Sequence, residues 1–259
     1  MKKKLTAYLP IGIVFLYLVI PLMATLLYSL STKWNKTVLP EGLTFSWYTT
    51  LFQDDQFIQA LMHSLILSAG ATVIAAVVMV PAIFTIVVYA PKWEKWLQAT
   101  VLMTYAMPGV IMAVGLLRAY SKAGLPMVLV TIGAYFIGIM PYMYQGTRNS
   151  LRNIRADKLM EAAELLGATR TKAFLQIIVP NILTGILVSA LLSFSILFGE
   201  FVLANLLLGG SFETIQIYLY QKLSKSGHLA SAIVVCYFLF ISILSSLVVK
   251  FAQRKKETI

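Results

Sequence analysis

The chain has 259 residues, of which 59% are hydrophobic and 12% charged, and its formal net charge is +11 at pH 7. This composition is too apolar for a soluble globular domain and indicates a protein that crosses a membrane several times. The basic residues collect beside apolar segments instead of forming one surface, which argues against nucleic acid as a partner. The single cysteine, Cys236, excludes an internal disulfide and a cysteine metal cluster.

Six apolar segments follow one another, each long enough to cross a hydrocarbon core of about 30 Å. We expect transmembrane helices at about residues 7–30, 60–80, 97–117, 125–144, 182–208 and 229–249. The second is expected to continue past Pro81, and Pro108-Gly109 is expected to kink the third. Residues 31–57 and 209–227 are expected to be polar loops. The predicted fold class is an all-α membrane protein with six transmembrane helices.

Lysine and arginine are distributed unequally between the two sides of these segments. Fifteen lie on the side that takes residues 2–4, 92–95, 148–172 and 250–256, and six lie on the other side, Lys36 among them. By the positive-inside rule we expect both termini and the loop at 148–172, opened by Arg148 and Arg152, to be cytoplasmic.

The stretch at 157–180 is basic and amphipathic and lies between two apolar segments. Asp157 is expected to cap a first short helix and Gly167 to end it, because glycine readily takes a left-handed conformation. Thr169 is expected to cap a second helix that runs to Pro180. The apolar face of the first helix is expected to carry Ala156, Met160, Ala163, Leu166 and Ala168. The sequence therefore predicts a helix–turn–helix on the membrane surface, of a shape that suits a groove on a partner protein.

The same stretch resembles the EAA motif of ABC importer permeases. Glu161-Ala162-Ala163 is followed by Gly167 and then by Ile177 and Pro180, although Val179 stands where the family usually has leucine. The resemblance implies that the first helix is a coupling element that sits in a cleft of a cytoplasmic ATPase subunit. Glu161 is then expected to make polar contacts with the ATPase, Ala162 and Ala163 to allow close approach, and Gly167 and Pro180 to shape the turn and the second helix.

Residues 60–250 as a whole resemble the membrane domain of type I ABC importers, which implies a MetI-like fold. They follow a first helix and extracytoplasmic loop at 1–59 and precede a basic cytoplasmic tail at 251–259. Met107–Leu117 and Phe198–Tyr220 resemble segments of permeases in the spermidine/putrescine group. The resemblance also implies partners: ATPase subunits, a second permease subunit that is a paralogue, an extracytoplasmic solute-binding protein and the lipid of a bacterial inner membrane.

No catalytic motif is found in the chain. It lacks a Walker A sequence, G-x-S-x-G and H-E-x-x-H, so we expect no enzyme activity and no cofactor, with ATP bound by the partner ATPase. Glu200 lies within an apolar segment, where a carboxylate is costly without a partner or water. We expect it either to pair with Arg118 or to line the solute path, and Asn205 and Tyr142 are further candidates for the path.

The sequence therefore predicts a permease subunit of an ATP-driven importer for a small polar solute, with a polyamine such as spermidine or putrescine favoured. A permease for 2-aminoethylphosphonate or ferric iron is the alternative within the family. An ATP-independent secondary carrier is a different class, and it is disfavoured because no inverted repeat and few intramembrane charges are found. A membrane scaffold is disfavoured by the polar residues in the spans.

Overall fold

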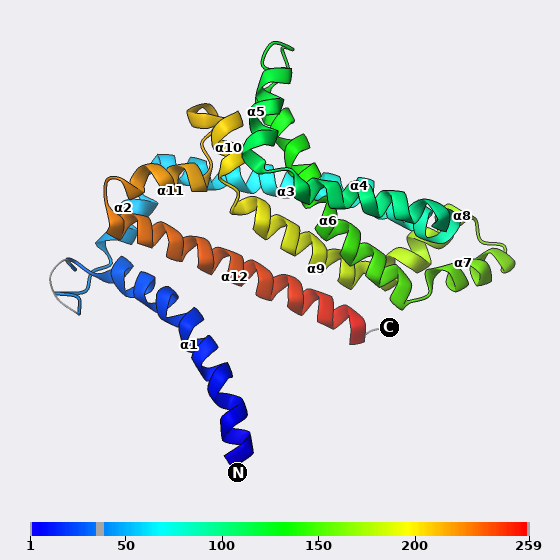
Figure 1. Ribbon diagram of the computed structural model, residues 1–259, viewed down its shortest axis with the longest axis horizontal. Helices are drawn as coiled ribbons and strands as arrows, with labels where there is room; N and C mark the ends of the chain where they lie inside the picture. Colours follow the sequence, from blue (N-terminus) through cyan, green and yellow to red (C-terminus); the bar gives the residue numbers. More distant parts are fainter. Residues whose placement is uncertain (1, 35–38, 258–259) are drawn as a thin grey trace. The chain divides into compact units, whose positions relative to one another are not determined.

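The computed structural model describes residues 2–34 and 39–257, with the backbone alone for 2–9, 251 and 253–257. Lys36 and the side chains of the basic residues at 2–4 and 254–256 therefore lie outside the described part. The elements, shown in Figure 1, are α1 (Lys2–Leu30), α2 (Ser46–Phe52), α3 (Asp55–Tyr89), η1 (Pro91–Trp93), α4 (Glu94–Ala106), α5 (Gly109–Tyr120), α6 (Met127–Asn153), α7 (Ala156–Leu165), α8 (Arg170–Ala173), η2 (Phe174–Ile178), α9 (Val179–Phe198), α10 (Val202–Leu207), η3 (Gly209–Phe212), α11 (Ile215–Leu223) and α12 (Gly227–Glu257).

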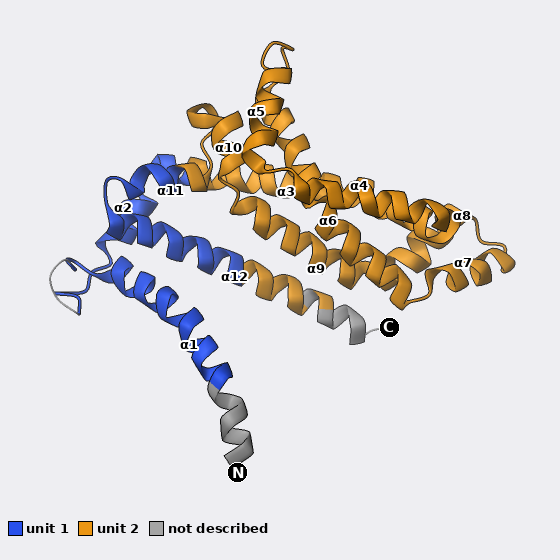
Figure 2. Cartoon of the chain, viewed as in Figure 1, with its two compact units in different colours: residues 1–58, 218–242 blue, residues 59–217, 243–259 orange. Residues whose placement is uncertain are grey.

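Two units make up the chain, and Figure 2 colours them separately. Unit 1 consists of residues 1–58 and 218–242, and unit 2 of residues 59–217 and 243–259. Unit 1 holds α1, α2 and the first half of α12, whereas unit 2 holds most of α3, the helices α4 to α10 and the last part of α12. The motif at 157–180 and the candidate path residues all lie in unit 2.

Five helices are long and apolar enough to cross a membrane, and the bent pair formed by η1–α4 and α5 makes up to six spans. The predicted fold class is thereby confirmed. The single helix α3 carries Pro81 inside it and continues to Tyr89, as expected. Proline removes the hydrogen bond to the carbonyl four residues earlier, but a membrane helix can still continue through it. One turn later, Thr85 Oγ1 donates to the Pro81 carbonyl at 2.8 Å.

The third predicted span is broken, not kinked. Helix α4 ends at Ala106, and α5 begins at Gly109 at an angle of 96° to the pair's first half. The reason is local: proline disfavours the helical conformation of the residue before it, and Met107 is extended, with ψ of 113°. The expected kink at Pro108-Gly109 was therefore too small a bend: the chain turns sharply there and the helix is interrupted.

The fifth predicted span, at 182–208, is wrong at both ends. Helix α9 is continuous with α8 and η2, so the span begins at Arg170 and ends at Phe198. The chain then breaks at residues 199–201 and continues as the short helix α10. Residues 31–57 and 209–227, expected to be loops, also contain the short helices α2, η3 and α11.

Helices α6 and α9 run antiparallel and cross very closely in unit 2 (Figure 2). A Cβ atom on Gly146 would overlap Ser189 Cβ, and one on Gly185 would overlap Ser150 Oγ. Each helix thus supplies a glycine and, four residues on, a serine, a spacing that lets two backbones approach in a membrane. The Gly-x3-Ser pattern occurs elsewhere in the sequence too, at 42–46 and 227–231, so the pattern alone does not say which pairs meet.

Three of the segments predicted to share one side of the membrane lie close together in unit 2. Glu94, the first residue of α4, pairs with Arg148 and Arg152 near the end of α6, so the basic segments at 92–95 and 148–152 lie at one end. The hydroxyl of Thr184, near the start of α9, donates to the Ala252 carbonyl at 3.4 Å, which brings the C-terminal part of α12 to the same end. We call it the basic end; its placement in the cytoplasm stays a prediction.

Unit 1 is held together by polar contacts near the ends of its helices. His228 stacks on Tyr28 with ring centres 4.1 Å apart and on Trp47 at 5.4 Å. The Asp54 carboxylate accepts from Tyr218 Oη at 2.7 Å and from Lys222 Nζ at 2.9 Å, and it ties α11 to the start of α3. Burial raises the pKa of Asp54, but these two donors and a backbone N–H outweigh it and hold the pKa below its usual value.

The α6–α9 crossing is expected to tolerate no added carbon at Gly146. Gly146→Ala should lower the free energy of unfolding by about 1–3 kcal/mol, because the overlap with Ser189 Cβ forces the helices apart. Thermal unfolding of the detergent-solubilised protein measures this. Gly138→Ala, on the same helix with nothing within 4 Å, is the matched control and should not destabilise. Adding Ser189→Gly to Gly146→Ala should restore stability, and equal stability of both single variants would contradict the close crossing.

Acid is expected to weaken unit 1 through Asp54. The folded state lowers the pKa of Asp54, so the ionised carboxylate adds to the free energy of unfolding. This stabilisation is complete above the pKa of the unfolded state, about 3.9, and is lost as the pH falls through the pKa of the folded state. Thermal unfolding of Asp54→Asn and of the unaltered protein should therefore differ at pH 7 and converge towards pH 3. Asp55→Asn, at a neighbour for which the described residues show no ion pair, should have the smaller effect at pH 7.

Candidate functional site

The short helix α7 lies between α6 and α8 at the basic end and turns one face inward. Ala156, Met160 and Ala163 are each no more than 4% exposed and belong to the core of unit 2. Their spacing of four and three residues places them on one face of a helix. Glu161 and Ala162 are exposed on the other face. The motif's two alanines therefore differ: Ala163 packs inside the chain, and only Ala162 is open to a partner.

Gly167 ends α7 in the predicted way. Its φ is +82°, its N–H donates to the Glu164 carbonyl and the N–H of Ala168 donates to the Ala163 carbonyl, both at 3.0 Å. These two bonds form a Schellman motif, which a left-handed glycine makes possible. Thr169 caps the following helix as predicted, because its hydroxyl accepts from the Lys172 N–H at 3.4 Å.

The start of α7 differs from the prediction. Asp157 does not cap it: the helix begins at Ala156, and the residue before it, Arg155, takes a left-handed conformation with φ of 50°. A residue with a Cβ atom occupies this region at a cost of order 1–3 kcal/mol, so the turn between α6 and α7 is held by its surroundings. Arg148 and Arg152 lie on α6 itself and not in a loop.

The C-terminal tip of α7, formed by Leu165 and Leu166, is apolar and exposed. Leu165 and Leu166 are 89% and 88% exposed. We had placed Leu166 on the inward face, which was wrong, because at 100° per residue it lies about 90° round the helix from that face. Together with the exposed Glu161 and Ala162, these two leucines form a small surface on α7 that has both apolar and polar groups. Such a surface suits a protein partner.

Glu164 fastens α7 to its neighbours, a role that our reading of the sequence missed. Its Oε1 accepts from Arg170 Nε and from Tyr89 Oη, each at 3.1 Å. The Arg170 guanidinium also lies 4.7 Å from the centre of the Tyr89 ring. Two helices and the end of α3 therefore meet at one carboxylate, and no local pattern in the sequence would have shown this contact.

Glu200 lies in the break between α9 and α10, at the opposite end of the α6–α9 pair from α7. Its two carboxylate oxygens accept from the N–H groups of Leu203 at 2.9 Å and Ala204 at 3.0 Å, and Tyr135 Oη donates at 3.3 Å. The N-terminus of a helix favours negative charge there. These donors satisfy the carboxylate without the expected pair: the ion pairs found among the described residues do not include Arg118, which is exposed on α5.

The other two candidates for the path lie apart from each other. Asn205 is half-buried on α10, which packs against the helix α5 that carries Arg118. Tyr142 is half-buried on α6, about 10 Å along that helix from Tyr135, and its ring lies 6.0 Å from that of Tyr105. The structure thus brings Glu200, Arg118 and Asn205 to one end of unit 2 and places Tyr142 farther inside. That they line a path stays a prediction.

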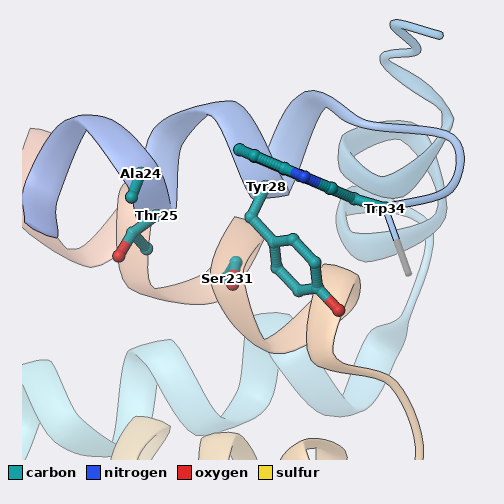
Figure 3. Close-up of a pocket in the computed structure, with 5 residues that line it drawn as sticks. All are labelled: Ala24, Thr25, Tyr28, Trp34 and Ser231. Atoms are coloured by element: carbon teal, nitrogen blue, oxygen red, sulfur yellow. The ribbon is translucent and has the colours of Figure 1, made fainter. Parts of the chain in front are cut away.

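A pocket of about 370 Å³ in unit 1 offers no comparable chemistry. Figure 3 shows its lining, which is Ala24, Thr25, Tyr28, Trp34 and Ser231. None of these side chains is charged at neutral pH, so the pocket has no strong group for selecting a charged solute. Within residues 2–34 and 39–257, groups of histidine, cysteine and carboxylate side chains suited to a metal ion are not found.

The sequence of this chain is similar to those of known proteins. Residues 87–257 match the family model described as the binding-protein-dependent transport system inner membrane component. The spermidine/putrescine transport system permease protein PotC of Haemophilus influenzae is 26% identical over 216 residues, which covers 83% of each chain. A protein of Salmonella typhimurium, provisionally named the 2-aminoethylphosphonate transport system permease PhnV, is 29% identical over 191 residues, covering 73% of this chain and 70% of that one.

A solved structure has the same fold. It is a bacterial ABC transporter involved in the import of the acidic polysaccharide alginate, and one of its chains superposes with a TM-score of 0.71 at 20% identity. The match covers 100% of this chain and 97% of that chain.

Proposed function

The chain belongs to the family of binding-protein-dependent transport system inner membrane components, and we propose that it forms the path of a small polar solute, with polyamines such as spermidine and putrescine favoured. It is a multi-pass protein of the bacterial inner membrane. The partners we propose are ATPase subunits at the basic end, a second and paralogous permease subunit, and an extracytoplasmic solute-binding protein. ATP is then bound by the partner ATPase and not by this chain.

The exposed tip of α7 is the observation that carries the coupling part of the proposal. A helix of ten residues presents Glu161, Ala162 and two bare leucines, while its inner face is anchored in the core and its end is set by Gly167. Such an element passes force to the spans because α6 precedes it and the continuous helix α8–η2–α9 follows it. Pro180, the second residue of α9, does not end that helix.

The choice of polyamine rests on one carboxylate and one relative. Glu200 Oε1 accepts one backbone N–H, and a carboxylate oxygen has room for a second donor such as an ammonium group. The relative named for spermidine and putrescine matches 83% of this chain. The second candidate is 2-aminoethylphosphonate, supported by the relative of that name and by the exposed Arg118 on α5.

Gly167→Val is expected to uncouple transport. A β-branched residue at φ of +82° is strained, so the turn after α7 must change, whereas the protein should still insert. Uptake of labelled spermidine by membrane vesicles should fall about tenfold, in the range of a coupling energy of 1–3 kcal/mol. Gly167→Asn is the matched control, because asparagine tolerates the left-handed region, and it should retain most uptake. Equal uptake by both variants, at equal amounts in the membrane, would count against α7 as the coupling element.

The two candidate solutes are distinguished by Glu200→Gln and Arg118→Gln. A polyamine path predicts the larger loss of uptake for Glu200→Gln, because a cation loses its counter-charge, and a phosphonate path predicts the larger loss for Arg118→Gln. Uptake of labelled spermidine and of labelled 2-aminoethylphosphonate should be measured for both variants. Glu200→Gln also weakens the contact of this side chain with the N–H groups of Leu203 and Ala204. Thermal unfolding of the variant shows whether this lowers its stability. Normal uptake of both solutes by both variants would remove these residues from the path.

A further inference from the structure

Glu94, the first residue of α4, is held by two arginines of α6. Arg152 Nη2 donates to its two carboxylate oxygens at 2.8 and 3.0 Å, and Arg148 Nε donates to Oε1. The Glu94 side chain is only 13% exposed, whereas Arg148 is 24% and Arg152 53% exposed. A mostly buried carboxylate with two guanidinium partners is a far more specific contact than an ion pair in water.

The arginines belong to a stripe along α6. Tyr144, Arg148 and Arg152 are spaced four residues apart, so their side chains lie on one face of the helix. The Arg148 guanidinium lies 5.8 Å from the centre of the Tyr144 ring, and Tyr144 is buried. The contact with the Tyr144 ring orients the Arg148 side chain, and the ion pair between Arg148 and Glu94 holds the start of α4.

The two helices joined at Glu94 lead to different parts of unit 2. Helix α6 passes through the strained Arg155 into α7. Helix α4 leads to the break at Met107-Pro108 and then to α5, which packs against α10, the helix that begins beside Glu200. Glu94 therefore joins α6, which leads into α7, to the bent pair.

We propose that Glu94 is a positioning residue for transport: it makes α4 move with α6, so that a push on α7 is passed to the broken span. The inference rests on the proposed function, since it presupposes that α7 is driven by an ATPase. It differs from the coupling motif itself, because Glu94 lies outside 157–180 and acts through Arg148 and Arg152. By contrast, the ion pair between Lys158 and Glu161 joins residues of the same helix and transmits nothing between elements.

The first experiment measures coupling in the intact complex recovered through an affinity tag on this chain and reconstituted in proteoliposomes. Glu94→Gln should lower the amount of labelled spermidine taken up per ATP hydrolysed about tenfold. Arg152→Gln, at a half-exposed position that leaves Arg148 in place, should lower the ratio about threefold and should fold in any case. In the Glu94→Gln background, Arg152→Gln should cause no further loss. Glu41→Gln, the same change at an exposed loop residue, is the matched control and should leave the ratio unchanged.

A second experiment measures the distance between α4 and α6 and needs no transported solute. In a Cys236→Ser background, spin labels are placed through Gln98→Cys on α4 and Asn149→Cys on α6, both exposed positions. The distance between the labels should stay narrow and unchanged between the nucleotide-free and ATP–vanadate states. Glu94→Gln should broaden it or make it depend on nucleotide.

The outcomes separate the two claims. If the unaltered complex shows no ATP-dependent uptake of spermidine or 2-aminoethylphosphonate, the proposed function is contradicted, whatever Glu94 does. If the unaltered complex transports, but Glu94→Gln and Arg152→Gln keep a normal ratio of solute to ATP, the inference about Glu94 alone is overturned. An unchanged label distance in Glu94→Gln would likewise overturn it.

Discussion

The close crossing of α6 and α9 is the contact on which the rest of unit 2 depends. Lipid is as apolar as leucine, so helices in a membrane are drawn together by close contact and not by the exclusion of water. Gly146 and Gly185 remove the side chains that would keep the two backbones apart. The pair then acts as a frame: its basic end holds α7 and Glu94, and its other end holds Tyr135 against Glu200. Both candidate regions are therefore positioned by the same two helices.

Unit 2 satisfies two of its half-buried acidic groups, Glu94 and Glu200, in different ways. Glu94 is neutralised by arginines, which suits a fixed contact between helices. Glu200 accepts from backbone N–H groups and one tyrosine and keeps its net negative charge, because none of these donors is a cation. A charge that is stabilised without being neutralised still attracts a passing cation, whereas a neutralised one does not. This difference is why we propose Glu94 as a positioning residue and Glu200 as a residue of the solute path.

Local features were predictable from the sequence, and long-range ones were not. The turn at Gly167, the cap at Thr169 and the passage of α3 through Pro81 each depend on a few neighbouring residues, and the structure has all three. Hydropathy found the spans but joined α9 and α10 into one, because an apolar segment with a break has nearly the same composition as one without. Some contacts join residues more than 50 positions apart: Glu94 with Arg148 and Arg152, Glu164 with Tyr89, and Glu200 with Tyr135. For these contacts, spacing in the sequence carries no signal. The Gly-x3-Ser pairs of α6 and α9 did carry a signal, but nothing in the sequence alone says which small residues face each other.

The break between α4 and α5 has a consequence for the bilayer around it. Helices of 13 and 12 residues rise about 20 and 18 Å, so neither crosses a hydrocarbon core of about 30 Å by itself. Where the first ends and the second begins, main-chain carbonyl and amide groups have no helical partner, and fatty-acid tails cannot supply one. If the corner at Met107-Pro108 lies at membrane depth, its free main-chain groups must therefore be covered by protein or hydrated by water.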